Sequence, residues 1–188
     1  MSRRSLFARW LKPSAEPAFQ PDQAGTQVLA ANRLPGFLRP PGAGKEDRFL
    51  ELCERCTDCR DACPYTVILP LGPAYGEAEG TPVILPQDDA CRLCEDLPCI
   101  ASCPSGALQP VPREDVNMGL ARLDSSLCLA VRGESCDSCV GSCPLGEKAL
   151  RWAGDRPEIL AAGCTGCGMC VEVCPPRARA LTIDPAGM

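Results

Sequence analysis

Cysteine spacing is the feature that most constrains what this chain can fold into. The 188 residues hold sixteen cysteines and no histidine. The cysteines fall into four groups of four, and a proline follows each group. The first and fourth groups read C-x2-C-x2-C-x3-C-P, while the second and third each contain one longer gap. We number the groups motif I (Cys53, Cys56, Cys59, Cys63), motif II (Cys91, Cys94, Cys99, Cys103), motif III (Cys128, Cys136, Cys139, Cys143) and motif IV (Cys164, Cys167, Cys170, Cys174).

This run of cysteines is the ligand pattern of bacterial ferredoxins. Three thiolates at every third residue can bind three corners of one [4Fe–4S] cubane, and in two-cluster ferredoxins the fourth cysteine binds the other cluster. The motifs should therefore work in pairs. We predict four [4Fe–4S] clusters, with all sixteen cysteines as iron ligands. The spacing leaves two pairings open: motif I with II and III with IV, or motif I with IV and II with III.

Other uses of cysteine fit this spacing poorly. Disulfides require an oxidising compartment, and the chain shows no complete export signal. Zinc sites of four cysteines join two separated C-x-x-C knuckles, whereas three cysteines of motif I fall between residues 53 and 59. The absence of histidine excludes a His-ligated haem, a Rieske centre and a Ser-His or Cys-His catalytic pair. A purely structural role for any one cluster remains an alternative.

The sequence also lacks the signatures of other chemistries. It has no G-x-G-x-x-G after a strand, no P-loop and no nucleophile with a matching base. We therefore expect a one-electron relay and no catalytic residues, so that the chain is an electron carrier and not a stand-alone enzyme.

The composition predicts an α+β fold with a thin apolar core. Hydrophobic residues make up 45% of the chain, but this figure includes the sixteen cysteines, and aromatic residues add only 4%. A compact chain with few bulky side chains usually needs metal or covalent cross-links. A helix is expected at 46–52. We predict two bacterial-ferredoxin-like units of short hairpins, small helices and irregular backbone, with β-prone stretches at 65–71, 81–85, 107–111, 120–123, 149–152, 158–161 and 180–183.

The first 44 residues differ from the rest of the chain. Residues 1–12 contain four basic and no acidic residues, with apolar residues at roughly helical spacing. We predict a basic amphipathic segment at 1–12, a Pro/Gly-rich linker at 13–44 and a four-cluster ferredoxin-like domain at 45–188. The first segment is either a docking helix for a partner or a membrane surface, or a frayed basic tail.

The opening residues also bear on the compartment. Arg3 and Arg4 resemble the start of a twin-arginine signal, but no apolar stretch follows them, and no run of about 18 apolar residues could span a membrane. We expect a cytoplasmic protein without a transmembrane segment, which can associate peripherally with the membrane. Export is the alternative if Arg3 and Arg4 do form a working signal.

Charge predicts the kind of partner. The formal net charge is −5, and residues 1–44 carry a net +4, which leaves −9 for residues 45–188. Four thiolate-bound clusters would make this body still more negative. It should repel nucleic acid, and we expect it to dock on a basic patch of a redox partner protein.

Several stretches resemble the NapF/NapG/MauM group of ferredoxin-type proteins. They are residues 39–43 (Arg-Pro-Pro-Gly-Ala), 94–99 and 103–107 in motif II, 118–121 (Met-Gly-Leu-Ala), and the wide gap between Cys128 and Cys136 in motif III. Together with the cysteines, the resemblance covers most of the chain. The residues near the cysteines are most similar to the NapG/MauM branch. The opening without an apolar segment is more similar to the cytoplasmic NapF branch.

The resemblance implies a function and partners. Members carry four [4Fe–4S] clusters and accompany periplasmic nitrate reductase or methylamine dehydrogenase systems. Electron transfer between a membrane quinol-oxidising module and a terminal oxidoreductase, such as a molybdoenzyme, is the implied role. The alternative is a cytoplasmic assembly or maturation factor for such a metalloenzyme.

Overall fold

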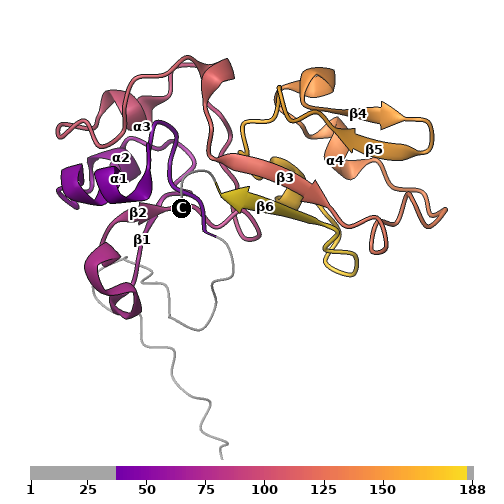
Figure 1. Ribbon diagram of the computed structural model, residues 1–188, viewed down its shortest axis with the longest axis horizontal. Coiled ribbons are helices and arrows are strands. Elements are labelled where there is room, and N and C mark those ends of the chain that lie inside the picture. The colour runs from indigo at the N-terminus through magenta and orange to yellow at the C-terminus, as the bar shows by residue number, and fades with distance from the viewer. Residues whose placement is uncertain (1–36, 186–188) are drawn as a thin grey trace, which may run out of the picture.

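A computed structural model describes residues 37–185 of the chain (Figure 1). The predicted basic segment 1–12 and residues 13–36 of the predicted linker lie outside this part. Within the described residues, short helices alternate with three two-stranded antiparallel ribbons. The protein is therefore a small α+β fold, as the composition predicts.

Residues 37–117, which we call the first half, contain motifs I and II. The ribbon of this half pairs Leu69 with Val83 and Pro70 with Pro82. Isolated bridges join Leu38 to Ile84 and Ala43 to Leu108. The elements are α1 (Glu46–Leu52), α2 (Asp58–Asp61), β1 (Leu69–Pro70), the 3₁₀ helix η2 (Pro73–Ala78), β2 (Pro82–Val83), α3 (Pro98–Ala101) and the 3₁₀ helix η3 (Arg113–Asp115).

Residues 118–185, the second half, contain motifs III and IV. Its longer ribbon pairs β3 with β6, from Gly119 opposite Pro185 to Leu123 opposite Leu181. A hairpin, β4 with β5, lies between the two motifs. The elements are β3 (Gly119–Leu123), α4 (Ser138–Gly141), the 3₁₀ helix η4 (Gly146–Lys148), β4 (Leu150–Ala153), β5 (Arg156–Ile159), α5 (Met169–Glu172) and β6 (Leu181–Pro185).

The two halves are closed in the same way. In the second half, the strand before motif III pairs with the strand after motif IV. In the first half, Ala43 precedes motif I and bridges to Leu108, which follows motif II. Each half also carries one ribbon between its two motifs. A chain segment before the first motif therefore meets a segment after the second, which folds the two motifs of one half toward each other.

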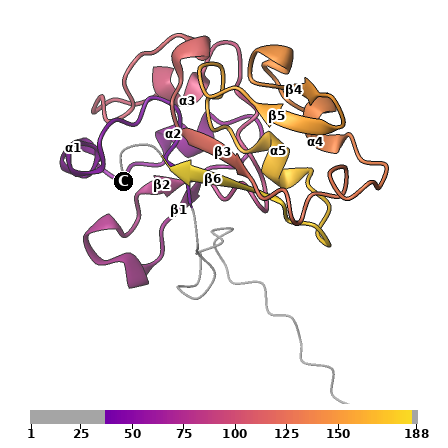
Figure 2. The same ribbon diagram turned by 45° about the vertical axis from the view of Figure 1, so that its right-hand side comes forward.

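The halves lie side by side, with α1, α2 and α3 at one end of the molecule and α4, β4 and β5 at the other (Figures 1 and 2). The larger apolar core lies mainly in the first half and extends into motif IV, and a smaller one surrounds motif III. The largest fully buried side chains of the larger core include Phe49, Leu38 and Ile68. Cysteines belong to both cores, as expected for a chain with few bulky side chains.

The last residues of the predicted linker, 37–44, are packed into the body. Leu38 is fully buried, and the Arg39 side chain is only 5% exposed. The guanidinium of Arg39 donates to Glu46, to Thr81 Oγ1 (2.8 Å) and to the Pro82 carbonyl (3.0 Å), and it stacks over the ring of Phe49. This cation thus ties residues 37–44 to α1 and β2.

Local predictions succeed where local geometry decides the structure. The predicted helix at 46–52 is α1, with the same bounds, and the stretches 120–123, 149–152 and 180–183 overlap β3, β4 and β6. The stretch 65–71 contains β1, and 81–85 contains β2.

One strand prediction is wrong, and the bounds of another are shifted. The stretch 107–111 contributes only the Leu108 bridge, because Pro110 and Pro112 lack the N–H that a longer ladder needs. The strand predicted at 158–161 is β5 and begins earlier, at Arg156. The turn before it takes only two residues, since Gly154 adopts a φ of 67°, and a two-residue hairpin turn favours such a backbone.

Candidate iron–sulfur sites

Each motif builds its cysteine loop in the same way. A four-residue helix carries the third cysteine of the motif, the first two cysteines lie before that helix, and the fourth lies two residues after its end. The proline that follows cannot continue a helix. The third cysteines are Cys59 on α2, Cys99 on α3, Cys139 on α4 and Cys170 on α5.

The helices pack in consecutive pairs. The helix α2 contacts α3, and α4 contacts α5. This packing brings motif I beside motif II and motif III beside motif IV. The structure thus distinguishes the two pairings that the spacing left open, and it brings together the motifs that are neighbours in sequence.

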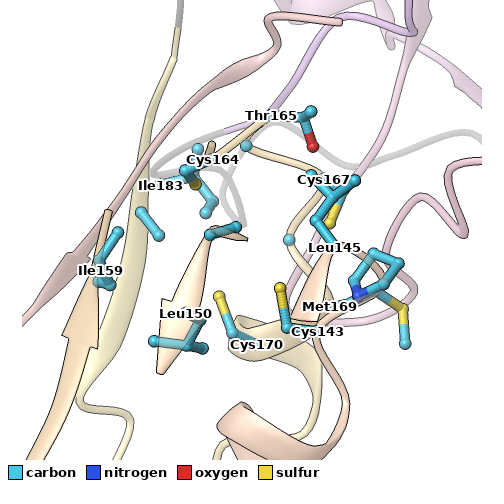
Figure 3. Close-up of a pocket in the computed structure, with 15 residues that line it drawn as sticks. Cys143, Leu145, Leu150, Ile159, Cys164, Thr165, Cys167, Met169, Cys170 and Ile183 are labelled. Atoms are coloured by element: carbon cyan, nitrogen blue, oxygen red, sulfur yellow. The ribbon is translucent and has the colours of Figure 1, made fainter. Parts of the chain in front are cut away.

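Three cavities are each lined by four cysteines, three from one motif and the last from its neighbour. We call them the motif II set (Cys91, Cys94, Cys99 and Cys63), the motif III set (Cys128, Cys136, Cys139 and Cys174) and the motif IV set (Cys164, Cys167, Cys170 and Cys143). Each set lines a cavity of its own. Figure 3 shows the four labelled cysteines of the motif IV set around one hollow.

We group the remaining four cysteines, Cys53, Cys56, Cys59 and Cys103, as the motif I set. Burial, together with the nearby thiols of Cys56, Cys53, Cys99 and Cys103, raises the pKa of the Cys59 thiol to about 12. Cys103 therefore lies beside motif I, although it belongs to motif II. All sixteen predicted ligands thus fall into four sets of four, and each set has the composition of a two-cluster ferredoxin site.

The cysteines surround a volume and do not converge on a point. Among residues 37–185, no group of three or more Cys, Asp or Glu side chains is arranged to hold a single metal ion. A [4Fe–4S] cluster needs four thiolates around the outside of a cubane, one for each iron. Four cysteines spread around one cavity, in a lining that is otherwise almost entirely apolar, fit that group.

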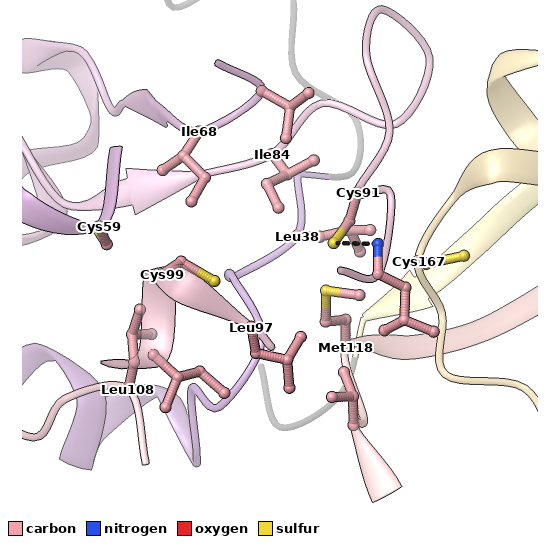
Figure 4. Packing of buried hydrophobic residues seen from close by; sticks show 14 of the residues in the cluster. Leu38, Cys59, Ile68, Ile84, Cys91, Leu97, Cys99, Leu108, Met118 and Cys167 are labelled. Carbon is pink, nitrogen blue, oxygen red and sulfur yellow. Dashed lines mark hydrogen bonds between the residues drawn. The ribbon is translucent and has the colours of Figure 1, made fainter. Parts of the chain in front are cut away.

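Backbone N–H groups point at several of the sulfurs. The Leu93 N–H donates to Cys91 Sγ and the Leu108 N–H to Cys103 Sγ, both at 3.4 Å, and the Ala180 N–H donates to Cys174 Sγ at 3.3 Å. Figure 4 shows the first of these bonds. Hydrogen bonds to cluster sulfurs raise the potential at which an electron is accepted.

Three of the four cysteine loops contain a left-handed residue at the same position. The residue two positions after the first cysteine has a positive φ in three motifs: 58° at Arg55, 49° at Leu93 and 71° at Gly166. Alternation of right- and left-handed residues turns successive N–H groups to one side and makes a concave site for anions, including iron–sulfur clusters. The loops therefore present positive dipoles to the cavities.

Three of the cysteine thiols have raised pKa values. Burial raises the pKa of the Cys91 thiol to about 12 and of the Cys99 and Cys139 thiols to about 11. Nucleophilic cysteines have lowered pKa values. The raised pKa values therefore favour ligand or structural roles for these three residues over nucleophilic catalysis, because bound iron supplies the positive charge that a buried thiolate needs.

The two halves meet at motifs II and IV. The Cys91 N–H donates to the Cys167 carbonyl at 3.1 Å. Glu172 accepts from the Ala90 N–H at 2.7 Å and pairs with Arg92 at 2.9 Å. We call this contact the junction. Because Cys91 and Cys167 belong to different sets, the motif II and motif IV sets are neighbours across it.

Proximity of thiols gives the order of the sets. The Cys59 thiol has Cys99 among its neighbours, which places the motif I set beside the motif II set. Burial raises the pKa of the Cys170 thiol, and Cys139 of the motif III set is among the thiols that add to this effect. With the junction between them, the four sets form a row in the order I, II, IV, III.

Sequence reasoning missed several residues of this region. Arg92 and Glu172 carry no motif signal, since ion pairs between distant segments are not visible in a sequence. Gly166 and Gly168 of motif IV pack closely against other parts of the chain. A Cβ on Gly166 would lie 2.5 Å from the backbone of Gly119, and one on Gly168 would meet Pro86 across the junction.

Comparison with known proteins agrees with this geometry. A family model described as "4Fe-4S dicluster domain" matches residues 120–175, which begin within β3 and end just after motif IV. The ferredoxin-type protein NapG of Escherichia coli K12 is 38% identical over 178 residues, covering 87% of this chain and 77% of that protein. The chain belongs to the family of NapG, MauM and NapF ferredoxin-type proteins.

Other relatives in this family have similar coverage. The methylamine utilization ferredoxin-type protein MauM of Methylorubrum extorquens is 38% identical, covering 98% of this chain and 89% of that protein. The NapF protein of Escherichia coli K12 is 31% identical, covering 73% of this chain and 80% of that protein. No solved structure matches the chain. Within residues 37–185, no helix is long and apolar enough to cross a membrane.

Proposed function

We propose that this family member relays single electrons through four [4Fe–4S] clusters, each bound by one of the four cysteine sets. The observation that carries the proposal is the row of four sets, in which each set lies beside the next. A bound [4Fe–4S] cluster accepts and releases one electron. The chain's own residues hold the clusters in sequence, direct N–H groups at their sulfurs and exclude water with the apolar cores.

The relay divides into two ferredoxin-like units in this proposal. Each half of the structure holds two motifs whose helices pack together, one ribbon between the motifs, and a closing pair of segments. The family model for a two-cluster domain spans both motifs of the second half. This supports two-cluster units linked at the junction.

We propose that a redox partner with a basic patch docks at motif I. Cys56 is solvent-exposed, so the motif I set reaches the surface at one end of the row. Glu54 and Asp58 are exposed beside it, and neither forms an ion pair within the described residues. Arg55 is engaged locally, since its guanidinium donates to the carbonyls of Glu77 (2.6 Å) and Glu79 (2.9 Å).

The partner system is proposed from the family. A membrane quinol-oxidising module and a respiratory or periplasmic oxidoreductase, such as a nitrate reductase-like molybdoenzyme, would be the donor and acceptor. The cytoplasmic location predicted from residues 1–12 is part of the same proposal.

Redox titration followed by EPR tests the relay. The purified, anaerobically loaded chain should contain iron and sulfide for four clusters, each reducible. Fewer than three reducible clusters would contradict the proposal. Deletion of residues 1–12 separates the relay from an assembly factor: the relay still accepts electrons from a chemical donor, whereas an assembly factor loses its main activity.

Two matched variants test the pairing. Replacing the last cysteine of motif II, Cys103→Ser, should perturb the motif I cluster, and Cys63→Ser should perturb the motif II cluster. Both variants should leave the clusters of the second half unchanged in EPR. A perturbed motif III or IV cluster in either variant would support the alternative pairing of motif I with IV and II with III.

A further inference from the structure

The cavity of the motif IV set contains one unexplained polar group. Thr165 is 2% exposed, and its Oγ1 atom is buried without a hydrogen-bond partner among the described residues. Its backbone carbonyl accepts from the Met118 N–H at 2.9 Å, so the main chain is fixed while the hydroxyl is unused. Buried hydroxyls are rarely left unsatisfied in native proteins.

The surroundings leave few candidates for a partner. Fifteen residues line this cavity, and Thr165 contributes the only side-chain oxygen or nitrogen among them. The others are cysteines, glycines, one proline, one methionine and aliphatic residues such as Leu145, Leu150 and Ile159. Figure 3 shows the Thr165 oxygen directed toward Cys167. The only side-chain acceptors that the rest of the lining offers to this hydroxyl are therefore sulfurs.

Thr165 also has a singular position among the motifs. The residue that follows the first cysteine is Glu54 in motif I, Arg92 in motif II and Leu129 in motif III. The Arg92 side chain forms ion pairs with Glu172 and Asp89. A short hydroxyl side chain at this position occurs only in motif IV, so any effect on a cluster should be confined to one of the four.

We propose that the Thr165 hydroxyl donates a hydrogen bond to a sulfur of the loaded motif IV set, either Cys167 Sγ or a cluster sulfide, and raises the reduction potential of that cluster. This inference rests on the proposed function. Reduction adds negative charge to the sulfurs, so a donor stabilises the reduced form more than the oxidised form.

The location gives this hydrogen bond a role in the relay. The Cys167 carbonyl accepts from the Cys91 N–H across the junction, so the motif IV cluster is the one that faces the first half. A higher potential there favours transfer of the electron from the motif II set into the second half. Thr165 is thus a positioning residue. Its hydroxyl stabilises the added electron on the motif IV cluster, at the one transfer step that connects the two halves.

The test compares Thr165→Val with Thr165→Ser in the full, cluster-loaded chain. Valine keeps the branched shape and removes the hydroxyl, whereas serine keeps the hydroxyl. Stepwise reduction by dithionite with redox mediators, followed by EPR, should show one potential lowered in Thr165→Val. We expect the reduced-to-oxidised ratio of that cluster to fall about tenfold at a fixed potential, which is about 59 mV for a one-electron couple. Thr165→Ser should stay near the parent chain.

A second readout does not depend on potentials. After exchange into D₂O, pulsed EPR of the reduced chain should detect one fewer exchangeable hydrogen near the cluster in Thr165→Val than in Thr165→Ser. If valine prevents loading, Thr165→Ala serves as the hydroxyl-free variant. Iron and sulfide content equal to that of the parent chain shows that a shift comes from the hydroxyl and not from loss of a cluster.

The outcomes separate the two proposals. Full loading with unchanged potentials and an unchanged deuterium signal would overturn the role of Thr165 while leaving the relay intact. A Cys167→Ser variant that keeps every cluster signal of the parent chain would instead overturn the assignment of the motif IV set, and the proposed function with it.

Discussion

Glu172 offers a sharp test of the junction. Its carboxylate accepts from the Ala90 N–H at 2.7 Å and pairs with Arg92 at 2.9 Å, and so connects α5 of the second half to motif II of the first. Replacing it, Glu172→Ala, removes the carboxylate that ties the two halves at this point. We expect this variant to weaken the contact between the halves and to lower the stability of the loaded chain.

The magnitude follows from burial. Ala90 is fully buried, so its N–H is left without an acceptor, which costs about 1–3 kcal/mol. Arg92 is partly exposed and keeps Asp89 at 3.1 Å, so loss of the ion pair adds only about 0–1 kcal/mol. A total near 2–3 kcal/mol corresponds to a decrease in Tm of about 5–10 °C for a chain of this size.

Two control variants isolate the cause. Glu158→Ala removes a similar pair, with Arg151 at 2.8 Å, but both side chains are about half exposed; its cost should be about 0–1 kcal/mol. Glu172→Gln keeps an acceptor for Ala90 and should retain most of the stability. Heat-induced loss of the visible absorbance of the clusters measures all three. Equal losses for Glu172→Ala and Glu158→Ala would refute the reasoning.

Three further predictions concern the buried cation, a glycine and the metal. Arg39→Met leaves Glu46 and Thr81 without their partner and should destabilise the chain by about 3–5 kcal/mol. Arg48 is exposed, so Arg48→Met should change the free energy of unfolding by less than about 0.5 kcal/mol. Thermal unfolding compares the two variants. Gly166→Ala places a methyl group against the backbone of Gly119 and also strains a left-handed residue, whereas Gly133→Ala causes the same strain without a clash. Gly166→Ala should therefore lower Tm more than Gly133→Ala. Similar Tm values for the two variants would contradict the close packing. Removal of iron should expand the chain, because cysteines form part of both cores; unchanged small-angle scattering after chelation would contradict a cluster-dependent core.

Local features of the fold were predictable because they depend on neighbouring residues. The helix 46–52, the small helix in each cysteine loop and most strands follow from spacing, turn residues and β-propensity. Errors arose where prolines or a two-residue turn shifted the pairing, as at 107–111 and 158–161. The packing of Leu38 and Arg39 was not predicted, since a Pro/Gly-rich stretch has the composition of a linker whether or not it is buried.

The sequence by itself determined the type of site. Four groups of four cysteines, with none left over and no histidine, indicate iron–sulfur ligands, and the family comparison agrees with that chemistry. Spacing within a motif controls a single turn and helix, which is why these features were readable from the chain alone.

Tertiary structure decided which motifs come together and in what order. Packing of α2 on α3 and of α4 on α5 brings Cys103 to motif I and Cys174 to motif III, and the Cys91–Cys167 contact joins the two halves. These contacts link residues far apart in sequence through backbone hydrogen bonds and apolar packing, so cysteine spacing alone was compatible with two pairings. The same long-range packing buries the Thr165 hydroxyl beside Cys167.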